Sequence, residues 1–103
     1  MTLEPGTKVA AADVGVALDG DSGFTTLAHV AGTEVGVWEH APGTSTDTEV
    51  DEVFVVISGA ARIDFVEPAL PSLEIGTGDV VRLAEGMWTW WTVTETLRKV
   101  YVA

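Results

Sequence analysis

The chain has 103 residues, a length that suits a single domain, and 47% of them are hydrophobic, which indicates a folded chain rather than a disordered one. Sixteen acidic residues against five basic ones give a formal net charge of −11. A surface of that charge repels phosphate backbones and anionic membranes, so we expect neither nucleic acid nor a membrane as a partner. Cysteine is absent, which excludes disulfides, thiolate catalysis and thiolate metal sites.

The pattern of apolar residues points to a protein of the cytoplasm. No apolar run is long enough to span a membrane. Residues 1–8 do not have the basic and then apolar order of a secretory signal. We therefore expect a cytoplasmic location.

Turn signals rich in Gly, Pro, Asp and Ser recur at intervals of about 8–12 residues, with short runs of Val, Ile, Thr, Phe and Trp between them. That spacing is typical of an all-β sandwich or barrel, and helical periodicity is not sustained anywhere. Residues 9–18 are expected to form a short strand or irregular structure. The predicted strands cover residues 24–30, 34–39, 50–57, 61–66, 72–75, 79–83, 87–93 and 97–102. No linker or repeat divides the chain, so residues 1–103 are expected to form one domain.

Two motifs and the C-terminal segment carry a family resemblance. In the first motif, Glu52 precedes Gly59 by six intervening residues, after the segment 38–43. The second motif opens with Gly-Asp at residues 78–79 and continues through a strand to residue 86. The chain closes on Trp-Thr-Val at 91–93 and Arg-Lys-Val-Tyr at 98–101. Together these features, within residues 33–102, resemble the cupin family, and in particular the small cupins related to the cupin domain of (S)-ureidoglycine aminohydrolase.

The resemblance implies an all-β, cupin-type (RmlC-like) double-stranded jelly-roll barrel, and a homodimer as the expected assembly. Metal-dependent cupins place a His-x-His pair three or four residues before the Glu, and a further His in the second motif. These positions hold other residues here: Thr46 and Thr48, or Ser45 and Asp47 with the longer spacing, and Thr89. A transition metal needs about three or four N, O or S ligands, and of the family set only Glu52 remains. We expect no metal and no cofactor.

The two histidines do not replace the missing ligands. If the strands around residues 31–33 form a hairpin, His29 lies near the turn and His40 at the open end, too far apart to share an ion. Each is expected to be a surface or hydrogen-bonded histidine. An unusual metal site built from Glu39, His40 and Glu52 stays open as a weaker alternative.

Alternation along the strands predicts which side chains face the barrel interior. If Glu52 points inward, so do Phe54, Val56 and Ser58; if Thr89 does, so does Trp91. Such an interior has apolar walls and a few polar groups, which is typical of a small-molecule pocket. The predicted ligand-binding residues are Thr46, Thr48, Phe54, Thr89, Trp91 and Tyr101. The alternative is that Glu52 is an internal acid without a ligand, bonded to Thr46, Thr48 or Arg82.

Catalysis, if there is any, is assigned to carboxylates. Glu52 and Glu39 are the candidate catalytic residues, because two carboxylates close together in a dry barrel would give one of them a raised pKa. Of Arg98 and Lys99, one should face inward and one outward.

Two functions follow from these residues. The first is a cupin that binds a small polar or carboxylated metabolite in the barrel without the usual His-based metal site, with acid–base catalysis as an option. The alternative is a non-catalytic dimerising or sensing cupin module, which the missing histidines favour. Whether the protein is an enzyme stays open.

Overall fold

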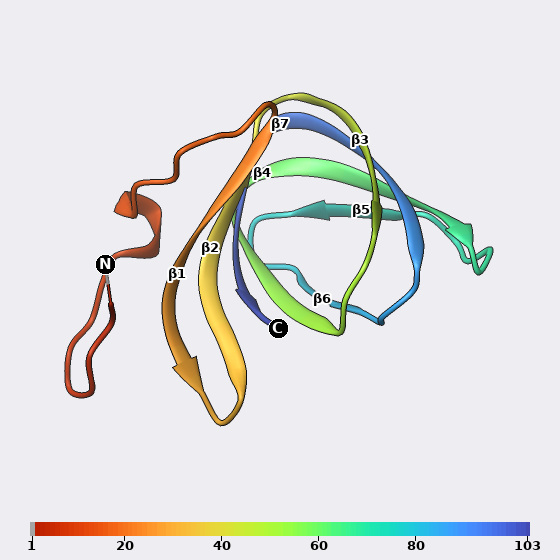
Figure 1. Cartoon of the computed structure of the whole chain (residues 1–103). Coiled ribbons are helices and arrows are strands. Elements are labelled where there is room, and N and C mark those ends of the chain that lie inside the picture. Colours follow the sequence, from red (N-terminus) through yellow and green to blue (C-terminus); the bar gives the residue numbers. More distant parts are fainter. Residues whose placement is uncertain (1) are drawn as a thin grey trace.

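Seven strands and one short 3-10 helix make up the fold, which the computed structural model describes for residues 2–103 (Figure 1). No helix in that range is long and apolar enough to cross a membrane. The elements are η1 (Ala11–Asp13), β1 (Ser22–Val30), β2 (Thr33–His40), β3 (Gly43–Thr48), β4 (Glu52–Glu67), β5 (Leu73–Gly76), β6 (Val80–Leu83) and β7 (Trp88–Val102).

The long strands β4 and β7 belong to two layers at once. Their first layer is β1-β2-β7-β4-β6, in which residues 97–102 of β7 pair with β2 and with the start of β4. In the second layer, residues 88–93 of β7 pair with β3 and with the end of β4, which in turn pairs with β5. All of these pairs are antiparallel. The all-β jelly-roll barrel expected from the sequence is therefore confirmed.

The bend in β4 depends on Gly59. The β4–β7 register shifts between Val56 and Ala61, and Gly59 has φ +93° at this bulge. A Cβ at this position would lie 2.1 Å from the carbonyl oxygen of Thr96 on β7. Only glycine combines that backbone conformation with so close an approach of the neighbouring strand.

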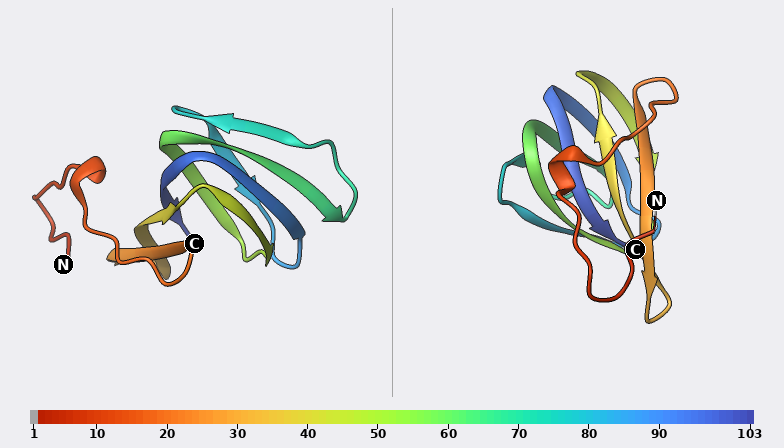
Figure 2. Two further views of the ribbon diagram at one scale, coloured as in Figure 1. Left: turned by 90° about the horizontal axis from the view of Figure 1, so that it is seen from above. Right: turned by 90° about the vertical axis from the view of Figure 1, so that its left-hand side faces the viewer.

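The apolar core lies between the two layers. Phe54, Ile63, Leu83 and Leu97 are fully buried there, and Trp91 packs in the same cluster. A second cluster joins the segment before β1 to the outer face of β1 and β2, through Val14, Leu27 and Val37. Figure 2 shows this N-terminal segment on the side of β1 and β2 away from the other strands.

The structure differs from the predicted elements in three places. The predicted strands 87–93 and 97–102 are joined in one strand, β7. The expected turn at Ser58 and Gly59 is a bulge inside one strand, so the predicted strands 50–57 and 61–66 are both parts of β4. Ser58 is exposed and does not follow Glu52 into the interior, because the bulge ends the alternation. Strand β3 was not predicted, since Gly43–Thr48 contains no hydrophobic residue. Residues 9–18 are irregular apart from η1.

Replacing Gly59 by alanine should destabilise the fold more than replacing Gly78. Both glycines have φ +93°, so both substitutions carry the backbone cost of about 1–2 kcal/mol. Only at Gly59 does the added Cβ also meet a strand, because nothing lies within 4 Å of a Cβ at Gly78. Urea denaturation of the two variants measures the difference. Equal losses of stability would show that the contact with Thr96 does not fix the bend.

Candidate functional site

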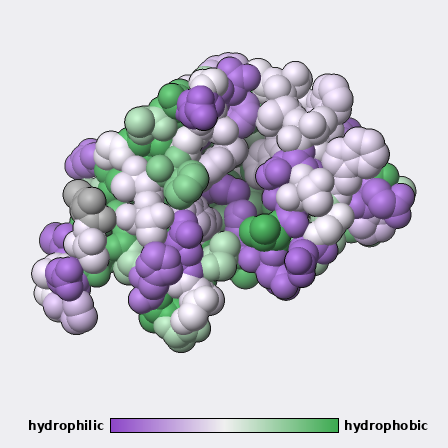
Figure 3. Space-filling model, viewed as in Figure 1, coloured by the Kyte–Doolittle hydropathy of each residue, from purple (hydrophilic) through white to green (hydrophobic). Residues whose placement is uncertain are grey.

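A cavity of about 620 Å³ opens between the β1–β2 hairpin and strands β3, β4 and β7. In Figure 3, which has the orientation of Figure 1, hydrophilic residues gather around the recessed middle of this face. The polar and charged lining residues are Ser22, Glu34, His40, Ser45, Thr46, Asp47, Thr48, Glu49, Glu52 and Lys99. Phe24, Trp38, Val50, Trp91, Tyr101 and Ala103 complete the wall.

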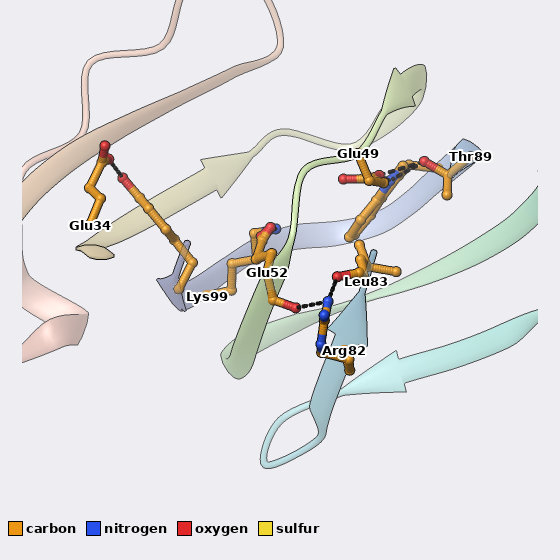
Figure 4. Close-up of polar contacts among 9 residues, drawn as sticks. Glu34, Glu49, Glu52, Arg82, Leu83, Thr89 and Lys99 are labelled. Carbon is orange, nitrogen blue, oxygen red and sulfur yellow. Dashed lines mark hydrogen bonds and ion pairs between the residues drawn. The ribbon is translucent and has the colours of Figure 1, made fainter. Parts of the chain in front are cut away.

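A buried ion pair lies at the base of the cavity (Figure 4). The ammonium of Lys99 is 2.9 Å and 3.1 Å from the two carboxylate oxygens of Glu52. Glu52 is 8% exposed and Lys99 is 5% exposed. Arg82, an alternative partner considered for Glu52, contacts only its backbone carbonyl. Lys99 faces inward and Arg98 outward, as strand alternation predicts.

Aromatic rings surround the Lys99 ammonium. Its Nζ lies 4.0 Å from the ring centre of Phe54, 4.6 Å from that of Trp38 and 5.2 Å from that of Trp91. All three distances are within the range of cation–π attraction. Burial among these rings lowers the pKa of Lys99, because the charged form loses its hydration, and Glu52 partly opposes this effect.

A second buried carboxylate, Glu49, lies in the loop between β3 and β4. It accepts hydrogen bonds from the Thr89 hydroxyl at 2.6 Å and from Trp91 Nε1 at 3.1 Å. Thr89 is fully buried and is not part of the cavity wall. Burial, with the nearby negative charge of Glu49, raises the pKa of Asp47 above its usual range. This side of the cavity is therefore rich in carboxyl groups.

Tyr101 forms the opposite wall together with Glu34. The Tyr101 hydroxyl donates to the Glu34 carboxylate, which also accepts from Thr26 at 3.1 Å. Burial, followed by the bond to Glu34, raises the pKa of Tyr101. Gly36 makes room for this ring, since a Cβ there would lie 2.5 Å from the Tyr101 oxygen.

His40 is a buried, hydrogen-bonded histidine of the wall. Its Nδ1 contacts the carbonyl of Ala41, which can only accept, so in the neutral ring Nε2 accepts from Ser45 Oγ at 3.0 Å. His29 is exposed beside the hairpin turn, paired with Glu34 across β1 and β2. The two histidines are thus at opposite ends of the hairpin, as expected.

The structure does not bring Glu39 to Glu52. Trp38 and His40 face the cavity, so Glu39, between them on β2, faces the other way. Its carboxylate accepts from Arg98 at 2.9 Å, and Arg98 also donates to the carbonyls of Ala11 and Val14. Glu39 therefore helps to hold the N-terminal segment and is not part of this site. The pair of catalytic carboxylates is not formed.

The other predicted site residues divide into two groups. Thr46, Thr48, Trp91 and Tyr101 line the cavity. Phe54 and Thr89 lie behind the wall and position Lys99 and Glu49.

The sequence did not predict the part played by Trp38, Asp47 or Glu49, or the pairing of Lys99 with Glu52. For Trp38 a signal was available. Strand alternation places it on the same face as Gly36 and on the face opposite to Glu39. Glu49 is in a loop, where alternation gives no signal.

The residues present do not suit the metal of metal-dependent cupins. Thr46, Thr48 and Thr89 offer hydroxyls, which are poor ligands, and both oxygens of Glu52 face the Lys99 ammonium. Within residues 2–103 there is no group of three His, Cys, Asp or Glu side chains that could hold a metal ion. The alternative site of Glu39, His40 and Glu52 is not assembled, because Glu39 faces outward.

A jelly-roll barrel with a cavity between its two layers of strands is the architecture of a cupin. The family model described as the EutQ-like cupin domain matches residues 28–101, and the chain belongs to this family. The chain matches none of the curated proteins with which it was compared.

Several solved structures share the fold. The EutQ protein of Clostridium difficile is 21% identical, with 95% of this chain and 80% of that one covered and a TM-score of 0.67. A protein of unknown function from Acidithiobacillus ferrooxidans is 25% identical, with 85% and 83% covered and a TM-score of 0.71. A protein of Salmonella typhimurium, provisionally assigned as ethanolamine utilization protein Q, is 20% identical, with 80% and 68% covered and a TM-score of 0.66.

Removing one partner of the buried pair should destabilise the protein strongly. Lys99→Met leaves the Glu52 carboxylate buried without a counter-charge, which costs about 3–5 kcal/mol of unfolding free energy. The double variant Glu52→Gln with Lys99→Met should recover most of that loss, because no unpaired charge remains. Urea denaturation gives the values. Glu74→Gln, in the exposed pair with Arg62, is the control and should change stability little. A Lys99→Met variant as stable as this control would contradict the prediction.

Proposed function

We propose that the cavity binds a small polar organic molecule that is neutral or positively charged, using the protein's own side chains and no transition metal. The observation that carries this proposal is the composition of the wall. Among residues 2–103, four carboxylates, those of Glu34, Asp47, Glu49 and Glu52, face the cavity, against one ammonium, that of Lys99. Trp38, Trp91 and Tyr101 supply apolar ring surface between them. Such a combination suits an apolar body with a cationic or hydrogen-donating end.

The charge of the wall separates the two ligand classes expected from the sequence. A carboxylated ligand would meet carboxylates on both sides of the cavity, in a chain whose net charge is −11. The single ammonium is already paired with Glu52. A polar ligand without a carboxylate avoids this repulsion, so we favour it over the carboxylated one.

Acid–base catalysis remains an option for the Glu52–Lys99 pair, in place of the pair of Glu39 and Glu52. The closer resemblance, to the cupins related to (S)-ureidoglycine aminohydrolase, stays a prediction. It agrees with a small nitrogenous or carbonyl compound as the ligand. The provisional name of the Salmonella relative adds ethanolamine, a small amine, as a compound to test.

The proposal predicts a preference by charge among ligands of one shape. Cyclohexylmethylamine, cyclohexylmethanol and cyclohexanecarboxylate share a ring and differ in the polar group. We expect the amine to bind at least about tenfold more tightly than the carboxylate, with the alcohol between them. Tryptophan fluorescence reports binding, since Trp38 and Trp91 line the cavity, and ethanolamine is titrated in the same way.

Two controls accompany these titrations. Glu49→Gln should reduce the preference for the amine, whereas Glu95→Gln, at an exposed position outside the cavity wall, should not. Dialysis against EDTA should leave the affinities unchanged. Tighter binding of the carboxylate, or no binding by any of these compounds, would sink the proposal.

A second candidate function, a dimerising module, has its own observation. Val35, Val53, Val55, Val80 and Val102 form an apolar patch on the outer face of β2, β4, β6 and β7, which we call the valine patch; the exposed Arg82 lies at its edge, opposite Val53. Val80 is 70% exposed. The N-terminal segment covers the adjoining part of the same face, around Val37 and Val100. Two copies of a chain this acidic need an uncharged surface in order to meet, so we infer that a second copy covers the valine patch.

The dimer can be tested by light scattering after gel filtration. We expect the wild type to have twice the mass of the chain, and the double variant Val53→Asp with Val80→Asp to have the mass of one chain. Val66→Asp, at an exposed valine outside the patch, should leave the dimer intact. A monomeric wild type, or dissociation by Val66→Asp as well, would exclude this interface.

A further inference from the structure

Lys99 combines three features that a nucleophilic lysine needs. Its ammonium lies in the wall of a cavity large enough for an organic molecule. It is desolvated among Trp38, Phe54 and Trp91. Both oxygens of the Glu52 carboxylate are within 3.1 Å of Nζ, so a proton acceptor is in place. A lysine with a purely structural role, in a barrel core or in an exposed salt bridge, does not need all three features.

We propose that Lys99 forms an imine with a small aldehyde or ketone held in the cavity, with Glu52 as the group that moves the protons. The inference rests on the proposed function, because the carbonyl compound must first bind in the cavity. It adds the chemical class of the ligand and a covalent step.

The step balances without an oxidant or a metal. The Lys99 ammonium gives a proton to Glu52, and the freed nitrogen lone pair forms a bond to the carbonyl carbon. The carbonyl oxygen takes the proton from Glu52, and the nitrogen returns one to it, which gives a neutral carbinolamine. Glu52 then protonates the hydroxyl, which leaves as water while the nitrogen lone pair forms the double bond to carbon.

The charges of the site are the same before and after this step. An ammonium paired with a carboxylate becomes an iminium paired with the same carboxylate. The rings of Trp38, Phe54 and Trp91, which stabilise the cation at the start, face the cation at the end. The site therefore holds the product without any new buried charge.

The wall limits the carbonyl compounds that fit. Glu34, Asp47 and Glu49 surround the route to Lys99 with negative charge. A keto acid would place its carboxylate among them. Neutral aldehydes and ketones, or those that also carry an amine, are the expected class.

The chain provides its own control, because Lys8 and Lys99 are its only lysines. Lys8 is exposed and lies outside the cavity wall. The full-length protein is treated with cyclohexanecarboxaldehyde and sodium cyanoborohydride at neutral pH, and the reduced adduct is mapped by peptide mass spectrometry. We expect at least about tenfold more adduct on Lys99 than on Lys8, since a larger fraction of its amine is neutral. The variant Lys8→Arg should keep the adduct.

The alcohol separates this inference from the proposed function. Cyclohexylmethanol has the same ring and cannot form an imine. If the alcohol binds and the aldehyde gives no excess adduct on Lys99, the imine is excluded and the binding function stands. If neither compound binds and no adduct forms, both fall. Equal labelling of Lys8 and Lys99 would show ordinary amine reactivity and exclude the inference.

The pH dependence of adduct formation in the wild type distinguishes a reactive lysine from a purely structural one. Formation of the Lys99 adduct should rise with pH and level off below the ordinary lysine pKa of about 10.4, because desolvation favours the neutral amine. The titratable groups that face Lys99 or the cavity around it are Glu34, His40, Asp47, Glu49, Glu52 and Tyr101. A profile that levels off only above that value would contradict the role given to burial.

Discussion

The ion pair between Glu52 and Lys99 constrains both the barrel and its cavity. Each group is almost completely removed from water, and either charge alone would cost several kcal/mol in that place. They can be buried only together, which requires residues 53–56 of β4 and 99–102 of β7 to be adjacent in one register. The pairing of these two strands also builds the base of the cavity. A polar group deep in an apolar barrel is thus tied to the arrangement of the strands that enclose it.

The same pair accounts for the way this barrel differs from the metal-dependent cupins that its sequence resembles. In a metal-dependent cupin a metal ion would supply the positive charge beside the glutamate. Here the ammonium of Lys99, on β7, supplies it. The resemblance assigns the histidine positions of such cupins to threonines, or, with the longer spacing, to Ser45 and Asp47 and one threonine. Of the threonines, Thr46 and Thr48 are at the cavity wall, and Thr89 orients the carboxylate of Glu49. The result is a site in which the ammonium of Lys99, rather than a metal ion, faces the carboxylate of Glu52.

The sequence predicted the fold through two kinds of signal. Turn residues at regular spacing and strand-forming runs between them gave the all-β class, and the Glu52–Gly59 and Gly78–Asp79 motifs gave the cupin barrel. The prediction failed where local pattern and tertiary contact disagree. Strand β3 has no apolar residue to mark it, and is held by pairing with β7 alone. Gly59 signals a turn locally, but in the structure β4 continues through it as a bulge packed closely against Thr96 on the neighbouring strand.

The site was predicted in part for the same reason. Alternation within a strand correctly grouped Glu52 with Phe54, and Thr89 with Trp91, and predicted that only one of Arg98 and Lys99 faces inward, because that rule needs only local backbone geometry. Which side chains meet across strands depends on register, which the sequence does not state. Trp38 lies opposite Lys99, and Glu39 opposite Arg98, and this register decides which glutamate enters the cavity. Loop residues such as Glu49 have no periodicity from which to be predicted.

Because β4 and β7 each run through both layers, the two layers share two strands and cannot separate from each other as independent sheets. The cavity opens at the rim of the barrel, between the β1–β2 hairpin and β3, where strands that belong to one layer form the wall, and a ligand of the proposed kind would enter there. The opening of the cavity and the ion pair at its base are therefore built from separate parts of the backbone, so substitutions in the hairpin can change the shape of the opening without disturbing Glu52 and Lys99.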